Sequence, residues 1–94
     1  MKVTVRLPGA LREAARGERA IEFELAEAAT VRDLLAAMAA GWPGVERRIR
    51  DETGVLRSHV NVFVGDANVR DLGGQEAALA DGDEVHVIPA VSGG

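Results

Sequence analysis

Cysteine is absent from the sequence, and lysine is nearly so. The absence of cysteine excludes disulfide bonds, cysteine nucleophiles and thiolate metal sites. Lys2 is the single lysine, and the other ten basic residues are arginines. A chain without cysteine is compatible with a cytosolic protein.

Positive charge and long apolar runs are also scarce. The net charge is -4 and the pI is near 5.1, which argues against binding to nucleic acid or to anionic membrane surfaces. No apolar run approaches the ~18 residues that a membrane span needs. Met1 leads directly into a strand pattern without a signal peptide, so we expect a cytoplasmic protein.

Alternating apolar and polar residues predict four strands, at residues 2–7, 20–25, 59–64 and 84–88. Residues 65–68 are expected to form a turn, followed by a short strand at residues 69–70. Short helical turns are expected at residues 11–16 and 75–79. Asp81-Gly82 is a strong turn signal before the last strand.

The clearest helix is predicted over residues 30–40. Thr30 fits the N-cap and Asp33 follows three residues later, as in a capping box. Gly41 occupies the position of a left-handed C-terminal cap, and Pro43 opens a second short helix. Four apolar residues form one stripe on the main helix: Val31, Leu34, Leu35 and Met38.

This order of elements predicts an α+β fold of the β-grasp, or ubiquitin-like, type. One main helix would pack on one face of a mixed sheet, with the first and last strands parallel at its centre. The expected organisation is one domain over residues 1–90 and a flexible tail at 91–94.

The tail Val91-Ser92-Gly93-Gly94 is the candidate functional element. Glycine has no Cβ, so its backbone passes through a channel that side chains would block. Five residues beyond Pro89 reach roughly 17 Å when extended, far enough to enter another protein's active site. The terminal carboxylate of Gly94 would then be the reactive group. A frayed end without a role is the alternative.

Beside this tail we expect a docking patch on the uncovered face of the sheet. Strand alternation turns Val62 and Val87 inward, and it turns Phe63, His86 and Ile88 outward. The third and last strands would be neighbours, so these outward side chains would gather. The alternative is that Phe63 packs under a loop and stabilises the monomer. The mixed-charge run at residues 46–52 is interpreted as a solvated helix face or, less favoured, as a docking patch.

The C-terminal half resembles the MoaD/ThiS family of sulfur carrier proteins, and the resemblance spans the whole chain. Ser92 departs from the Ala or Gly that is usual in such tails, but it is also small. The similar segments are Val60-Asn61-Val62-Phe63-Val64-Gly65-Asp66, Asn68-Val69-Arg70, Leu79-Ala80-Asp81-Gly82-Asp83-Glu84-Val85 and Ile88-Pro89-Ala90-Val91-Ser92-Gly93-Gly94.

The resemblance implies a protein co-substrate and not an enzyme. A ubiquitin-activating-type enzyme would use ATP to adenylate Gly94, and a sulfur donor would convert the adenylate to a thiocarboxylate. The chain looks most like the carriers that serve a pyridoxal-phosphate cysteine synthase. It would bind no cofactor of its own.

Two further functions remain open. The chain resembles the small subunit of molybdopterin synthase, whose tail enters a large catalytic subunit. It also resembles ubiquitin-like modifiers, although Lys2 alone could accept a chain-forming linkage. A pure interaction module is the weakest alternative. We expect no metal site, because His59 and His86 are far apart in sequence and no cysteine accompanies them.

Overall fold

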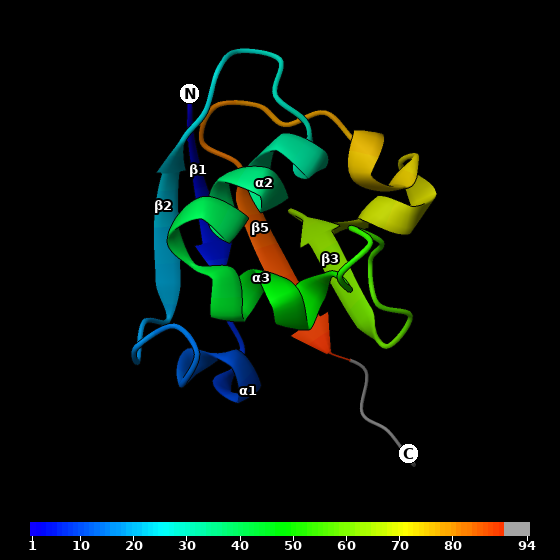
Figure 1. Cartoon of the computed structure of the whole chain (residues 1–94). Coiled ribbons are helices and arrows are strands. Elements are labelled where there is room, and N and C mark those ends of the chain that lie inside the picture. Colours follow the sequence, from blue (N-terminus) through cyan, green and yellow to red (C-terminus); the bar gives the residue numbers. More distant parts are fainter. Residues whose placement is uncertain (90–94) are drawn as a thin grey trace.

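The structure is a computed structural model that describes residues 1–89, and the predicted tail 91–94 lies outside the described residues. Within these residues, five strands and three α-helices follow one another along the chain. Figure 1 shows how they are arranged. They are β1 (Lys2–Arg6), α1 (Gly9–Arg12), β2 (Ala20–Glu24), α2 (Val31–Gly41), α3 (Pro43–Ile49), β3 (Val60–Val64), β4 (Ala67–Asn68) and β5 (Glu84–Pro89).

The strands form one mixed sheet in the order β2-β1-β5-β3-β4. β5 lies at its centre, parallel to β1 and antiparallel to β3. This arrangement confirms the predicted β-grasp topology, including the parallel first and last strands and the pairing of the third strand with the last.

The core lies between the sheet and the two longer helices, α2 and α3, which cover the same face (Figure 1). Val62 and Val87 are buried, as are Leu34 and Met38 on the apolar stripe of α2. Ile49 brings α3 into the same core. The second short helix was predicted, and it lies beside α2 on the same face. Among residues 1–89, no helix covers the outer face of the sheet (Figure 1).

Thr30 caps α2 as predicted, and its side chain and that of Asp33 form a reciprocal capping box. The predicted left-handed cap at Gly41 is wrong, because Gly41 is the last helical residue of α2 and Trp42 is its C-cap. Pro43 begins α3 immediately afterwards, and a proline disfavours helical geometry in the residue before it. Trp42 therefore makes the break with a φ of -135° and a ψ of 57°, so no glycine with positive φ is needed.

The predicted strand at residues 69–70 is also wrong. The sharp turn at Gly65, whose φ is +58°, sends the chain back so that Ala67 and Asn68 pair with β3. The Asn68 side chain then accepts a hydrogen bond from the Arg70 backbone N–H and starts a 3-10 turn over Val69–Asp71. A second 3-10 turn spans Gly74–Glu76, where a helical turn at 75–79 was expected.

Candidate functional site

The central strand β5 determines where the candidate tail leaves the fold. Its last residue, Pro89, pairs with Val60 at the beginning of β3. Val91, Ser92, Gly93 and Gly94 follow Pro89 in the chain and lie outside the described residues. The surfaces beside Pro89 are therefore the ones that a protein binding this tail would meet first.

One such surface is the outer-face patch, formed by Phe63, His86 and Ile88. Phe63 pairs directly with His86 across β3 and β5, and Ile88 lies two residues further along the same face. The three side chains line a hollow of about 280 Å³ together with the turn residues Gly65 and Asp66. The structure thus brings together the three residues predicted to form a patch, while their docking role stays a prediction.

The patch is apolar with a polar border. Ile88 is 48% exposed, while Phe63 and His86 are half-buried. Glu84 lies beside it, with its Oε1 3.6 Å from His86 Nε2 and 3.1 Å from Arg6 Nε. A large exposed aliphatic side chain next to a half-buried aromatic ring is the composition expected of a protein-binding surface.

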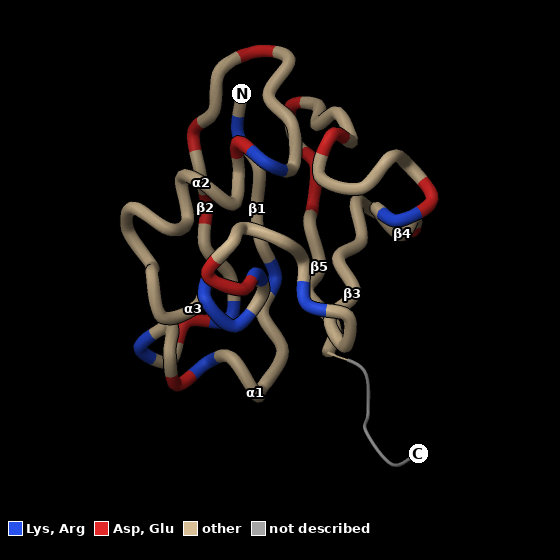
Figure 2. The backbone as a smooth tube through the Cα atoms, turned by 45° about the vertical axis from the view of Figure 1, so that its right-hand side comes forward, with Lys and Arg blue, Asp and Glu red and all other residues tan. Residues whose placement is uncertain are grey.

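The second surface, a basic cleft, was not predicted as a unit. It has a volume of about 430 Å³, and its lining includes Leu11, Arg47, Arg48, Arg57, His59 and Pro89. Figure 2 shows the basic (blue) stretch of backbone at α3 that contributes to this surface.

The mixed-charge run at residues 46–52 was interpreted as a solvated helix face. That is correct for Arg47 and Arg48, which are exposed, and wrong for Glu46 and Arg50, which are buried as an ion pair. This interpretation did not show that the segment before β3 would bring Arg57 and His59 beside the two exposed arginines at the end of β5.

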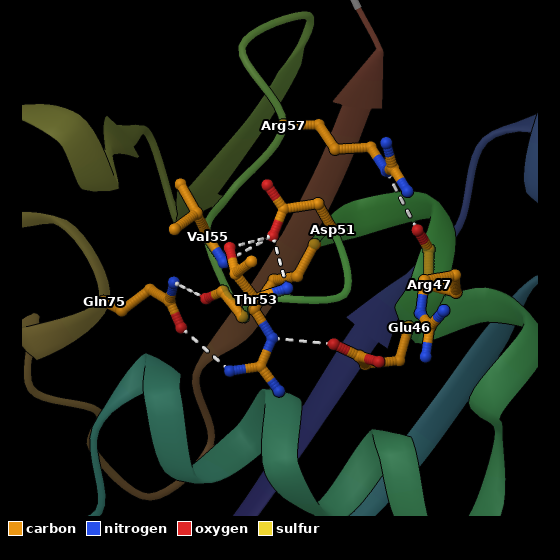
Figure 3. A network of polar contacts seen from close by, with 9 residues as sticks. Glu46, Arg47, Asp51, Thr53, Val55, Arg57 and Gln75 are labelled. Atoms are coloured by element: carbon orange, nitrogen blue, oxygen red, sulfur yellow. Dashed lines mark hydrogen bonds and ion pairs between the residues drawn. The ribbon is translucent and has the colours of Figure 1, made fainter.

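A polar network fixes the segment that carries Arg57 (Figure 3). The nearly buried Arg50 donates from Nε to Glu46 Oε2 at 2.7 Å and from Nη1 to Gln75 Oε1 at 3.1 Å. Gln75 in turn donates to the Gly54 carbonyl oxygen at 2.8 Å. The turn after α3 is therefore tied both to that helix and to the distant Gly74–Glu76 turn.

Asp51 organises the same turn from within. One of its carboxylate oxygens accepts hydrogen bonds from the Thr53 hydroxyl, the Thr53 backbone N–H and the Val55 backbone N–H. These bonds, led by that of the Thr53 hydroxyl and assisted by the positive charge of Arg57, hold the pKa of Asp51 below its ordinary value. Arg57 Nε then reaches back 2.9 Å to the Arg47 carbonyl oxygen, which closes one side of the cleft.

The two histidines belong to different surfaces, His59 to the basic cleft and His86 to the outer-face patch. Within residues 1–89, no cluster of three or more His, Cys, Asp or Glu side chains is arranged to hold a metal ion. Among the same residues, no helix is both long enough and apolar enough to cross a membrane.

Comparison with known proteins shows the family to which this chain belongs. The ThiS family model matches residues 5–94, which is nearly the whole chain and includes the tail. The chain belongs to the ThiS family. It is 36% identical to the sulfur carrier protein CysO of Mycobacterium tuberculosis over 96 residues, covering 100% of both chains. It is also 35% identical to small archaeal modifier protein 3 of Haloferax volcanii, again over 100% of both chains.

Solved structures agree with this membership. A chain of the Amycolatopsis orientalis BexX/CysO complex is 37% identical and superposes with a TM-score of 0.83, covering 98% of this chain and 99% of that one. The CysO structure from Mycobacterium tuberculosis gives a TM-score of 0.81 at 35% identity, with 95% and 99% coverage. The predicted family is thus confirmed in both sequence and fold.

Proposed function

We propose that this protein is a sulfur carrier that uses the carboxylate of Gly94 as its reactive group. The observation that carries the proposal is the full-length match to CysO, together with a family model that extends through Gly94. The fold is compatible with it, because the last strand, β5, ends at Pro89, five residues before Gly94 in the sequence.

The chemistry explains why an activating enzyme is required. A carboxylate with a pKa near 3.5 is ionised at neutral pH and resists nucleophiles. Transfer of AMP from ATP to the Gly94 carboxylate releases pyrophosphate and gives an acyl-adenylate with a good leaving group. A sulfide equivalent then displaces AMP and leaves a thiocarboxylate, C(=O)S⁻. The carrier is a co-substrate in both steps and binds no cofactor, while the activating enzyme binds the ATP.

We propose cysteine synthesis as the destination, because the C-terminal half resembles carriers that serve a pyridoxal-phosphate cysteine synthase. A pyridoxal-phosphate cysteine synthase would present an aminoacrylate, formed from O-phosphoserine by loss of phosphate. The thiocarboxylate sulfur adds to the alkene carbon and gives a carrier–cysteine adduct, which a protease then trims. A protein-modifier role is the second candidate, because the equally long match to a small archaeal modifier protein favours it. Transfer to the large subunit of molybdopterin synthase is the remaining destination.

Intact-protein mass spectrometry of the chain isolated from its own cells tests the class. We expect a population that is heavier by the replacement of one oxygen with sulfur, and we expect fragmentation to place the change at Gly94. A chain that carries no sulfur under sulfur-replete growth, but is found linked to lysines of other proteins, would instead support the modifier role.

A reconstituted reaction tests the destination. Thiocarboxylated carrier mixed with O-phosphoserine and the pyridoxal-phosphate synthase should give the carrier–cysteine adduct, whereas unloaded carrier should not. Sulfur transfer to a molybdopterin precursor, without any adduct from O-phosphoserine, would assign the carrier to molybdenum cofactor synthesis.

A further inference from the structure

The basic cleft carries more positive charge than its surroundings neutralise. Arg48 Nη1 donates to the Gly44 carbonyl oxygen at 2.7 Å, and Arg57 Nε donates to that of Arg47, so both bind neutral backbone groups. Within the described residues, no ion pair joins a carboxylate to Arg47, Arg48 or Arg57. This local positive charge occurs in a chain whose net charge is -4.

Two carboxylates from the segments that build the cleft, those of Glu46 and Asp51, are already engaged. Glu46 pairs with Arg50, which does not line the cleft. Asp51 senses the charge of Arg57, but it is bonded to Thr53 and Val55. The cleft arginines are therefore available to an anionic group from outside the domain.

The base of the cleft is apolar, and this restricts which class of anionic ligand would fit the cleft. Leu11, Val60 and Val87 line it and are each less than 10% exposed, whereas Arg47 and His59 are exposed at its edge. A free inorganic anion would use the arginines and leave the apolar base in contact with water. A peptide that carries an aliphatic side chain between carboxylates would use both.

The position of the cleft indicates which protein would supply that peptide. Pro89 lines the cleft and lies two residues before the tail in the sequence. An enzyme that adenylates Gly94 must hold it within roughly 17 Å of Pro89, which brings the enzyme's surface close to the cleft. Val87 lines the cleft and Ile88 the outer-face patch, and neighbouring strand residues point to opposite faces. The cleft is thus a second surface, separate from the patch.

We propose that the basic cleft binds an acidic segment, bearing an aliphatic side chain, of the enzyme that adenylates Gly94. This inference rests on the proposed function. It assigns Arg47, Arg48 and Arg57 to docking of the carrier, with no part in the chemistry at the tail.

Adenylation kinetics with a matched charge control test the docking role. Arg47→Glu and Arg19→Glu change the net charge equally. Both side chains are exposed, and neither forms a hydrogen bond within residues 1–89. In ATP–pyrophosphate exchange at low salt, Arg47→Glu should raise the KM for the carrier about tenfold with kcat unchanged, whereas Arg19→Glu should stay within about twofold. Added salt should raise the KM of the wild-type carrier towards that of Arg47→Glu, because salt screens the charge attraction. Equal effects of the two variants would overturn the proposal.

A peptide titration tests whether the cleft binds an acidic segment, and it does not require adenylation of Gly94. Absence of adenylation would contradict only the proposed function, not the proposed binding at the cleft. The probes are a blocked Asp-Glu-Leu-Glu-Asp peptide, its Lys-Lys-Leu-Lys-Lys counterpart and inorganic phosphate, followed by NMR of the full chain. Only the acidic peptide should shift the amides of Arg47, Arg57 and His59, and Arg47→Glu should abolish the shifts.

Two results would overturn the proposal. Identical shifts with phosphate would show a simple anion site. If deletion of residues 91–94 shifted the same amides without any peptide, the occupant would be the chain's own tail.

Discussion

The outer-face patch and the basic cleft lie on opposite faces of β5 and are built in different ways. The patch comes from strand residues in register, since Phe63 faces His86 directly. The cleft joins α3 to an irregular segment, and the Arg50 and Asp51 networks hold that segment in place. The patch therefore depends on the sheet alone, whereas the cleft depends on polar contacts between segments that are distant in sequence.

The chemistry of the two surfaces differs as well. The patch offers exposed aliphatic and aromatic surface, which contributes affinity when it is desolvated at the centre of an interface. The cleft offers arginines, which act over longer distances and speed association. If both contact an activating enzyme, we expect the patch to affect dissociation of the complex and the cleft to affect its formation.

Deletion of Gly94 should have the largest effect, because it separates both surfaces from the chemistry. We expect thiocarboxylate formation to be lost, as the reacting carboxylate would then belong to Gly93 and lie one residue short. The melting temperature should be nearly unchanged, since β5 ends five residues earlier, at Pro89. The measurement is sulfur loading by mass spectrometry with calorimetry as the control. Normal loading of the shortened chain would refute the assignment of Gly94.

Glu46→Ala should have the second largest effect, and it should disturb the basic cleft without disturbing the outer-face patch. It leaves the Arg50 guanidinium, only 11% exposed, without its ion-pair partner, and breaking such a buried pair costs about 3 kcal/mol or more in unfolding free energy. We expect amide NMR shifts to extend from residues 50–57 into the cleft and to spare Phe63 and His86. Chemical denaturation gives the free energy.

A control for this variant is Glu22→Ala, which removes an exposed ion pair with Lys2 whose charged atoms are 3.9 Å apart. Its loss should cost less than about 1 kcal/mol. Equal destabilisation by the two variants would mean that the Glu46–Arg50 pair does not hold the segment.

The contrast also explains what the sequence could predict. Alternation in β3 and β5 turned Phe63 and His86 outward, and pairing of neighbouring strands then sufficed to bring them together. The capping box at Thr30 was equally local. The basic cleft could not be derived in this way, because the position of Arg57 depends on Gln75 and Gly54, which contact each other across 21 residues of chain. Gly41 failed as a cap because Pro43 forced the break at Trp42.

The next largest effects are expected from Phe63→Ser and Ile88→Ser, which test the docking role of the outer-face patch. Each should weaken binding to the activating enzyme or the sulfur acceptor by more than about 1 kcal/mol, as expected for a central interface anchor. The unfolding free energy should change by less than that, because Ile88 is exposed and Phe63 half-buried. If Phe63→Ser lowers the melting temperature and leaves partner affinity intact, Phe63 stabilises the monomer and the patch is not a docking site.

The smallest effect should come from Thr53→Ala, which probes the turn that carries Arg57. The Thr53 hydroxyl is the main cause of the lowered pKa of Asp51, so its removal should raise that pKa towards 3.8. Because the folded-state pKa lies below the unfolded one, the carboxylate stabilises the fold above pH 3.8, and this contribution is lost as the pH falls through the folded-state value. The variant should therefore be less stable than wild type near neutral pH, and the difference should shrink in acid.

Carboxyl NMR titration gives the pKa, and denaturation at several pH values gives the stability difference. Ser58→Ala removes a hydroxyl from the same segment without a bond to Asp51, so it should change neither quantity. If Thr53→Ala leaves the Asp51 pKa unchanged, the backbone donors and the charge of Arg57 lower that pKa without the hydroxyl. The turn would then hold Arg57 in the cleft without the hydrogen bond from the Thr53 side chain.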